Sequence, residues 1–316
     1  MIKLTVPEFA QALRAQKTFL LLTHRRPDGD TVGSAAALCR GLRALGKEAC
    51  VLENPQLTEK YRSYLAGLTC PAPKTGACVV AVDTASADML CQGAQGLAVD
   101  LLLDHHGSNG GFALQGLVEP GAAACGQLVF SVLRELGISL DKPTAEALYV
   151  AVSTDTGCFR YSNTTAETLR VAAACLEAGA DTYPINKALF ETTRLPRLRL
   201  NAYLAQHLEL HAGGRVALCP IPLEVEQETG VTEDDLEDVS NFARNIEGVD
   251  LAVTLRTVEG GDTKVSVRCA PQYDAAAVCL HLGGGGHRAA GGATIRAGQD
   301  QAGALVLQAL REAGIL

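Results

Sequence analysis

Short apolar runs alternate with helix-like stretches through the first half of the chain. Residues 17–23, 77–82 and 98–103 are apolar runs of strand length, bounded by Gly, Asp or polar turns. Such runs are typical of strands that are covered on both faces in a parallel sheet. Helical spacing of apolar residues is seen at about 31–45, 124–136, 143–153 and 165–178. This alternation predicts an α/β domain with a mainly parallel sheet.

The second half has a different pattern and predicts a smaller α/β domain. A helix is expected near 195–211 and an acidic helix near 232–246, whose run EDDLED we interpret as a solvated helix start. The remaining expected elements are strands at 215–221, 250–257 and 263–269, and helices at 274–281 and from about 300. We therefore predict domains at 1–190 and 213–316, joined by a linker helix within 191–212.

Length and composition agree with two globular domains. The chain has 316 residues, of which 47% are hydrophobic and 20% charged. No apolar stretch approaches the roughly 18 residues that a membrane span needs, and the N-terminus lacks the apolar core of a signal peptide. We therefore expect a cytoplasmic protein without a membrane partner. An apolar helix face in the first domain fits a homodimer surface as well as a core.

Charge and cysteine content narrow the class of protein. A net charge of −8 argues against a protein that coats long nucleic acid, but not against a short anionic substrate. The 11 cysteines are odd in number and dispersed, with no CxxC pair. We interpret them as reduced, mostly buried thiols, with a disulfide or zinc site as the alternative.

Four clusters of acidic and His residues stand out because each lies at or just after the end of an apolar segment. They are HRRPDGD (24–30), AVD (81–83), LDHH (103–106) and STDTG (153–157). The carboxyl ends of parallel strands face one crevice, so residues distant in sequence can converge there. Each cluster alone could be a turn or a helix cap, but four together in a chain with seven His favour a site.

The ligand types in these clusters indicate the metal. Carboxylate oxygen and imidazole nitrogen without thiolate suit Mn²⁺ or Mg²⁺ better than structural zinc. Two such ions can activate a water, neutralise a phosphoryl group and stabilise a leaving oxygen. The clusters therefore predict a site for two divalent metal ions, which suits hydrolysis of a phosphate ester.

At this point the chain resembles a known family. The segments HRRPDGDTVGS, AVD, LLLDHHGSN and STDTGCFRYSNTT are similar to the four successive motifs of the DHH phosphoesterase superfamily. HLGGGGHRAAGGA at 281–293 is similar to the glycine-rich motif of its DHH-associated C-terminal domain. Within the superfamily, the chain most resembles the bacterial oligoribonuclease and 3′-phosphoadenosine-5′-phosphate phosphatase branch, which is related to RecJ-like exonucleases. The resemblance implies a catalytic first domain and a substrate-binding second domain.

The resemblance also implies roles for individual residues. One metal ion would be held by His24 and Asp28, and the other by Asp30, His105 and Asp155. Asp83 would bridge the two ions, so that they share a hydroxide nucleophile. His106 would face the scissile phosphate as electrophile or proton donor, while Asp104 would orient an imidazole. Mn²⁺ is the expected ion, with Mg²⁺ or Co²⁺ as alternatives.

Substrate contacts are expected mainly in the second domain. Its glycine run leaves the backbone bare, so that amides can approach a phosphate or base. The candidates are Gly284, Gly285, Gly286, His287, Arg288 and Arg268, with Arg160 in the first domain as a contact or a surface ion pair. Two departures from the family pattern, Arg25-Arg26 before the Pro and Cys125-Gly126-Gln127, affect expected substrate contacts rather than metal ligands.

These features favour hydrolysis of short oligoribonucleotides or of 3′-phosphoadenosine 5′-phosphate. A short single-stranded RNA or small nucleotide would fit a two-domain cleft, whereas a long duplex would not. The alternatives are a cyclic- or linear-dinucleotide phosphodiesterase, a pyrophosphatase, and a non-catalytic nucleotide-binding protein. The last predicts the loss of a metal ligand, and none is lost.

Overall fold

The chain forms two compact units, each with its own sheet and core. A computed structural model describes residues 1–236 and 239–316, with His287 described by its backbone only. The units comprise Met1–Thr192 and Thr193–Leu316. No helix among the described residues is both long and apolar enough to cross a membrane. The predicted α/β class, with a mainly parallel first sheet and a smaller second one, is confirmed.

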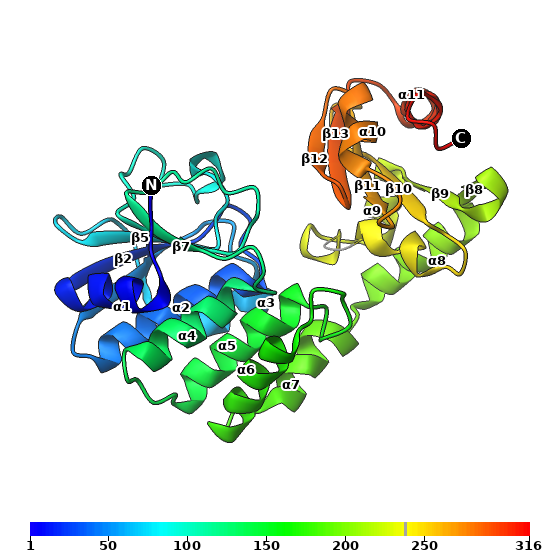
Figure 1. Cartoon of the computed structure of the whole chain (residues 1–316). Helices are drawn as coiled ribbons and strands as arrows, with labels where there is room; N and C mark the ends of the chain where they lie inside the picture. The colour runs from blue at the N-terminus through cyan, green and yellow to red at the C-terminus, as the bar shows by residue number, and fades with distance from the viewer. Residues whose placement is uncertain (237–238) are drawn as a thin grey trace. The chain divides into compact units, whose positions relative to one another are not determined.

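The first unit is a seven-stranded sheet with helices (Figure 1). Its strands are β1 (Ile2–Lys3), β2 (Thr18–Leu22), β3 (Glu48–Leu52), β4 (Thr69–Cys70), β5 (Cys78–Val82), β6 (Leu101–Asp104) and β7 (Gln115–Val118). The α-helices are α1 (Val6–Ala15), α2 (Gly29–Ala44), α3 (Glu59–Arg62), α4 (Cys125–Glu135), α5 (Lys142–Asp155), α6 (Ala166–Glu177) and α7 (Thr182–Asn186). Short 3₁₀ turns η1 (Ser63–Leu65) and η2 (Ala87–Met89) and a π-helical turn η3 (Lys187–Glu191) complete it.

The strand order brings the acidic and His clusters to one edge. The order is β1-β7-β6-β5-β2-β3-β4, and every pairing is parallel. The chain passes outward from β2 to β3 and β4, then returns to the other side of β2 as β5, which makes a topological switch point. Ligands bind beyond the carboxyl ends of strands at such points. Three of the four clusters follow β2, β5 and β6, which are neighbours.

Both faces of this sheet are buried, but by different means. Phe19 and Leu21 of β2 point into a core shared with α1, α2, α4 and α5, which lie together on one face (Figure 1). Leu20 and Leu22 point into a second cluster, formed with residues of the β5–β6 connection such as Leu90. The continuous apolar pattern of the strands follows from this double burial.

Tight packing of α2 against α5 brings the fourth cluster, residues 153–157, close to the start of α2. A Cβ on Gly33 would lie 2.3 Å from the carbonyl oxygen of Ala147, and one on Gly29 would lie 2.4 Å from the Thr154 side chain. The two helices can therefore approach closely only because these positions lack a side chain. The contact sets the first turn of α2 beside the last turn of α5, and so Asp30 near Asp155.

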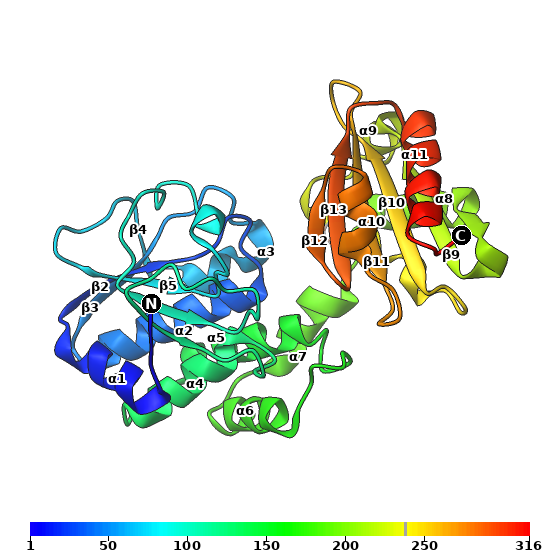
Figure 2. The same ribbon diagram turned by 45° about the horizontal axis from the view of Figure 1, so that its top comes forward.

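The second unit is a six-stranded, mostly antiparallel sheet with helices on both faces (Figure 2). Its strands are β8 (Glu209–His211), β9 (Val216–Ile221), β10 (Leu251–Thr257), β11 (Thr263–Cys269), β12 (Gly285–His287) and β13 (Ala290–Ile295), in the order β12-β13-β11-β10-β9-β8. Its helices are α8 (Leu195–His207), α9 (Leu223–Thr229), α10 (Ala275–His281) and α11 (Gln299–Glu312). The 3₁₀ turns are η4 (Ala212–Gly214), η5 (Asp234–Leu236), η6 (Val239–Asn241) and η7 (Ala243–Asn245).

Two expectations for this unit are wrong. The helix predicted at 195–211 ends at His207, because the next residues pair with β9 as the edge strand β8. Leu200 and Leu204 of α8 are buried with β9, so this helix belongs to the core of the second unit.

The predicted acidic helix at 232–246 is instead a series of 3₁₀ turns, with 237 and 238 outside the described residues. The buried Asp235 carboxylate accepts hydrogen bonds from the Thr232 amide (2.9 Å) and the Arg194 guanidinium (2.6 Å). Asp235 is therefore not a solvated helix-start residue. Its side chain competes with helical hydrogen bonding at this point.

One pair of cysteines departs from the expectation of reduced thiols. Cys50 and Cys70 form a disulfide between β3 and β4, with their Cα atoms 5.8 Å apart. The parallel pairing of these short strands brings the two residues within bonding reach. The other nine cysteines are free, and all but Cys158 are buried, as expected of thiols that serve as small apolar residues.

Candidate metal centre

The loop after β2 supplies a first group of ligand atoms. Nε2 of His24 lies 3.5 Å from Oδ1 of Asp28 and 3.7 Å from Oδ2 of Asp83. Nδ1 of His24 lies 2.9 Å from the carbonyl oxygen of Arg25, which can only accept a hydrogen bond. The proton is thereby held on Nδ1, and Nε2 is available as a ligand. Asp28 caps α2 by accepting from the amides of Asp30 and Thr31, each at 3.1 Å.

A second group of ligand atoms lies next to the first and is centred on His105, in the loop after β6. Nε2 of His105 lies 3.2 Å from Oδ2 of Asp155, 3.6 Å from Oδ2 of Asp30 and 3.4 Å from Oδ1 of Asp83. Its Nδ1 lies 3.1 Å from the Ala122 carbonyl oxygen, which again leaves Nε2 as the ligand atom. Within each group, the ligand atoms lie within 4.8 Å of one another.

Asp83 lies between the two groups, with Oδ2 toward His24 and Oδ1 toward His105. It is 2% exposed and has a φ of 54°, a left-handed conformation that is uncommon for a residue with a side chain. Asp83 Oδ1 and His105 Nε2 are both buried and make no hydrogen bond. Buried polar atoms are rarely left without a partner. The donor set and the lack of a hydrogen bond at these two atoms therefore fit divalent cations bound at this edge.

Asp30 is held in place by α4, a helix that is distant in the sequence. Its Oδ2 accepts from the Cys125 amide at 2.6 Å, and its Oδ1 from the Gly126 amide at 3.0 Å and the Ser34 hydroxyl at 2.9 Å. The first two donors are at the start of α4, where amides have no partner within the helix. The positive end of the α4 dipole thus stabilises a carboxylate that is fully buried.

His106 faces a different partner from His105. Its Nδ1 lies 2.7 Å from Oδ1 of the fully buried Asp104, and its side chain is 35% exposed. Asn109 donates through Nδ2 to Oδ2 of Asp104 at 2.5 Å and to the Thr84 carbonyl at 3.1 Å. This chain of contacts orients the imidazole, with Nε2 as its outward nitrogen. The hydrogen bond that His106 donates to Asp104 raises the pKa of His106, although burial opposes it.

Without a bound metal ion, several groups of the cluster have raised pKa values. Burial and the neighbouring carboxylates of Asp83 and Asp155 raise the pKa of Asp30 well above its usual range, and burial likewise raises that of Asp83. Burial lowers the pKa of His24, but its hydrogen bond and charge interaction with Asp28 outweigh this and raise it to about 9. Protons thus compensate the clustered carboxylates when no cation does so.

We expect Mn²⁺ binding to release protons and to strengthen as pH rises. Metal binding at Nε2 of His24 requires loss of a proton that is retained up to a pKa of about 9. Because this folded-state pKa is raised from 6.5, the protonated His24 stabilises the metal-free protein below pH 6.5, and that stabilisation disappears as pH rises through 9.

Calorimetry at pH 7.5 in buffers of different ionisation enthalpy measures this release. Release of at least one proton per protein is expected, with the His24 share vanishing above pH 9. An observed enthalpy that does not change with buffer would contradict the interpretation.

The predicted substrate contacts lie in two places. Arg160 follows α5 in the first unit, and its Nε donates to the Gly157 carbonyl at 2.6 Å. Arg268 is on β11, in one row with Ala290 and His287 of the neighbouring strands. Arg288 is exposed and donates to the Pro271 carbonyl at 3.2 Å. The side chain of His287 lies outside the described part of the chain.

The three glycines proposed as contacts differ in their surroundings. A Cβ on Gly284 would lie 2.2 Å from the Gly292 carbonyl oxygen, and one on Gly286 would lie 2.5 Å from that of Ala290. Both are therefore needed for β12 to approach β13, whatever else they do. A Cβ on Gly285 would meet no atom within 4 Å, so its surface is open.

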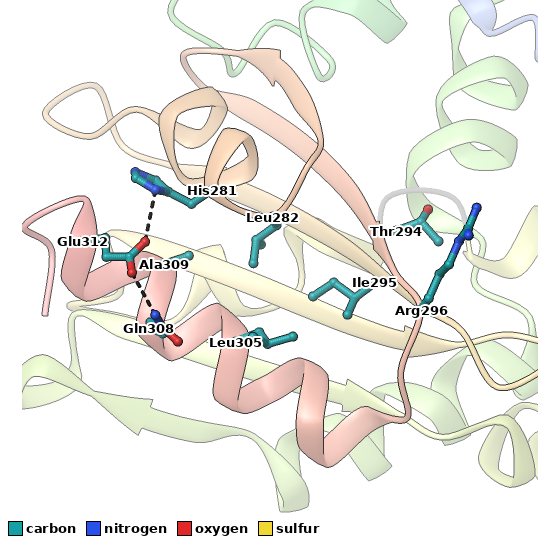
Figure 3. Close-up of a pocket in the computed structure, with 9 residues that line it drawn as sticks. All are labelled: His281, Leu282, Thr294, Ile295, Arg296, Leu305, Gln308, Ala309 and Glu312. Atoms are coloured by element: carbon teal, nitrogen blue, oxygen red, sulfur yellow. Dashed lines mark hydrogen bonds and ion pairs between the residues drawn. The ribbon is translucent and has the colours of Figure 1, made fainter.

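A separate pocket of about 300 Å³ in the second unit contains none of these contact residues (Figure 3). It lies between the ends of α10 and β13 and one face of α11. Three of its polar side chains interact with each other: Glu312 lies 3.1 Å from Nδ1 of His281 and accepts from Gln308 at 2.8 Å.

Comparison with known proteins identifies the family. The DHH family N-terminal domain matches residues 18–152, and the DHHA1 domain matches 214–313. A bifunctional oligoribonuclease and PAP phosphatase, NrnA of Thermus thermophilus, is 35% identical over 96% of this chain and 92% of its own. The chain belongs to the DHH family of phosphoesterases. The NrnA protein of Bacillus subtilis is 26% identical over 91% of this chain and 92% of its own.

The fold of this DHH protein is also found in a solved structure. An exopolyphosphatase-related protein from Bacteroides fragilis matches with a TM-score of 0.85 and 21% identity, covering 97% of this chain and 95% of its own. The matched N-terminal domain ends at residue 152, so Asp155 lies just beyond it. The structure nevertheless places Asp155 among the other ligand atoms.

Residues that support the centre were missed by sequence reasoning. Ser34, the Cys125 and Gly126 amides, and Asn109 all hold a predicted site residue. Asn109 had a signal, because it closes the same LLLDHHGSN segment as the two His. Ser34 lies one turn after Asp30 on α2, a spacing that brings side chains together. The expectation that Cys125-Gly126-Gln127 affects substrate contacts rather than metal ligands is wrong, because the Cys125 and Gly126 amides hydrogen-bond to Asp30, which is 95 and 96 residues away in the sequence.

Proposed function

We propose that this DHH protein hydrolyses short oligoribonucleotides to mononucleotides, and 3′-phosphoadenosine 5′-phosphate to AMP, with two divalent metal ions. The observation that carries the proposal is the position of the buried Asp83 between His24 and Asp28 on one side and His105 on the other, with an Oδ1 that makes no hydrogen bond. The substrate class is supported by the Thermus relative, which is 35% identical along nearly the whole chain and is named an oligoribonuclease and PAP phosphatase.

The residues divide between metal binding and phosphate contact. His24 and Asp28 would hold one ion and Asp30, His105 and Asp155 the other, with Asp83 between them. Such a pair of ions supplies a water of lowered pKa and neutralises charge on the phosphoryl group. His106, oriented by Asp104 and Asn109, would direct its Nε2 proton at a phosphoryl or leaving oxygen.

Mn²⁺ is the proposed ion because the donors mix carboxylate oxygen with imidazole nitrogen. Mg²⁺ prefers oxygen ligands in near-ideal octahedral geometry and keeps several waters, so two imidazoles suit it less well. Co²⁺ accepts the same donors and would substitute in assays. No thiol is among the ligand atoms of these groups, which argues against a structural zinc site.

The test is release of phosphate and mononucleotide by the purified full chain with Mn²⁺. The panel contains 5′-phosphorylated di- to pentaribonucleotides, 3′-phosphoadenosine 5′-phosphate, cyclic dinucleotides and pyrophosphate, each repeated after metal removal and with Mg²⁺ or Co²⁺. Metal-dependent mononucleotide release from the short oligomers is expected. Turnover confined to cyclic dinucleotides or pyrophosphate would replace the proposed substrate class, and no turnover at all would favour a binding protein.

A further inference from the structure

The turn that follows Asp155 has an unusual backbone. Gly157, Cys158 and Phe159 have φ angles of 56°, 56° and 63°. Two of these three consecutive left-handed residues carry side chains, so the conformation is strained. Thr156 maintains it: its carbonyl accepts from the amides of Arg160 (2.9 Å) and Tyr161 (3.0 Å). Strain of this kind persists where surrounding contacts enforce it, and it is frequent at functional sites.

The two aromatic side chains of the strained turn differ in their surroundings. Phe159 packs against Tyr149 of α5, with ring centroids 5.8 Å apart. Tyr161 is 52% exposed. A Cβ on Gly157 would lie 2.4 Å from Cζ of the Tyr161 ring and within 2.7 Å of both Cε atoms. The ring therefore packs directly on the bare Gly157, and about half of the side chain remains open to solvent.

The same turn is tied to the proposed metal ligands. Asn163 donates through Nδ2 to the Asp155 carbonyl and to the Ala123 carbonyl, each at 3.1 Å. The neighbouring Ala122 carbonyl is the partner of His105 Nδ1. The Asn163 side chain, two residues after Tyr161, is thus hydrogen-bonded to the segments that position two ligands of one ion. In the described part of the chain, no carboxylate forms an ion pair with the adjacent Arg160.

We infer that Tyr161 is a stacking platform for a base of the nucleotide whose phosphate is hydrolysed at the metal centre. The inference rests on the proposed function and adds a base-stacking contact in the first unit. An exposed aromatic ring with one supported face binds any nucleobase by stacking, without selecting its sequence. Arg160, beside it, offers guanidinium nitrogens to the phosphate backbone. Substrates without a base at this position should therefore gain nothing from Tyr161.

Comparison of substrates with and without a base tests the inference. The substrates are 5′-phosphorylated diadenylate and its two analogues with an abasic ribose on one or the other side of the scissile phosphate. Tyr161→Ala should raise KM for the diadenylate about 5- to 150-fold, the range for loss of one base–aromatic stack, while kcat changes little. Tyr161→Phe should restore KM. For one abasic analogue, wild type and Tyr161→Ala should have the same KM.

Tyr183 provides a matched control. It is 67% exposed on α7, and the Lys187 ammonium lies 5.8 Å from its ring centroid. Tyr183→Ala should leave every KM unchanged. An unchanged KM for the diadenylate in Tyr161→Ala, or an equal rise for all three substrates, would overturn the inference, the latter because it would indicate damage to the turn.

A binding measurement separates this inference from the proposed function. If the wild type hydrolyses none of the substrates, calorimetry with Mn²⁺ compares AMP with ribose 5-phosphate. Tighter binding of AMP by wild type, lost in Tyr161→Ala and kept in Tyr161→Phe, would support the stack although the proposed activity had failed. Equal affinity for the two ligands in wild type would overturn it.

Discussion

Asp83→Asn is expected to reduce kcat by at least about 10³-fold, the upper end of what loss of one charge-stabilising group costs. Asp83 is the residue between the two groups of ligand atoms, and the amide cannot supply negative charge to both. The substitution preserves shape, so the protein should still fold. Because burial raises the pKa of the Asp83 carboxyl, the neutral amide should be tolerated well in the metal-free state. The stabilisation by Mn²⁺ in thermal unfolding should largely disappear.

Asp88 supplies the control for this experiment. It is an exposed carboxylate in the same β5–β6 connection, on the short turn η2. Asp88→Asn should retain wild-type kcat and the full thermal shift with Mn²⁺. If Asp83→Asn kept kcat within tenfold of wild type, or kept the Mn²⁺ shift, Asp83 would not be the shared ligand.

The positions of the acidic and His clusters could be predicted from the sequence because of the sheet topology. Apolar runs of strand length identified β2, β5 and β6, and parallel strands expose their carboxyl ends at one edge. His24, Asp83 and His105 could therefore be expected to converge although they are far apart in sequence. The position of Asp155 was harder to predict, because this residue ends a helix and does not follow a strand. Its placement depends on the close contact that Gly29 and Gly33 allow between α2 and α5.

The supporting contacts could not be predicted in the same way. Asp30 depends on two amides at the start of α4, and no periodicity in the sequence specifies where a helix end points. The prediction of a helix in the acidic segment near 235 was wrong for a related reason. Its composition suits a helix start, but the Asp235 side chain hydrogen-bonds to Thr232 and Arg194 instead. Side-chain hydrogen bonds of this kind override propensity locally.

The glycine run of the second unit shows how one pattern can have two causes. Its glycines were interpreted as a bare backbone for a phosphate or base. Gly284 and Gly286 are required by the approach of β12 to β13, which is sufficient reason for them to be glycine. Gly285 has no such requirement and remains the glycine of the three for which ligand access is the simpler explanation. Composition alone could not separate these two roles.

His106→Asn is expected to lower kcat by about 10²- to 10⁴-fold, the usual range for loss of a general acid. The Asn amide can keep the hydrogen bond that Nδ1 of His106 makes with Asp104, but it does not reach the position of Nε2. The metal centre should therefore stay intact while the proposed proton donor is removed. Thermal stabilisation by Mn²⁺ should match wild type, in contrast to Asp83→Asn. The control His207→Asn, at an exposed position at the end of α8, should change neither quantity.

This pair of measurements also decides between two roles for His106. The residue is close enough to Asp83 and His105 for the three to form a third group of ligand atoms, with His106 Nδ1 at 3.6 Å from Asp83 Oδ1. Nδ1 is much closer to Asp104, however, and a nitrogen that donates to a carboxylate at 2.7 Å has no lone pair for a metal. Loss of the Mn²⁺ shift in His106→Asn would mean that His106 binds metal after all. A retained shift with a collapsed kcat would assign it to the phosphate.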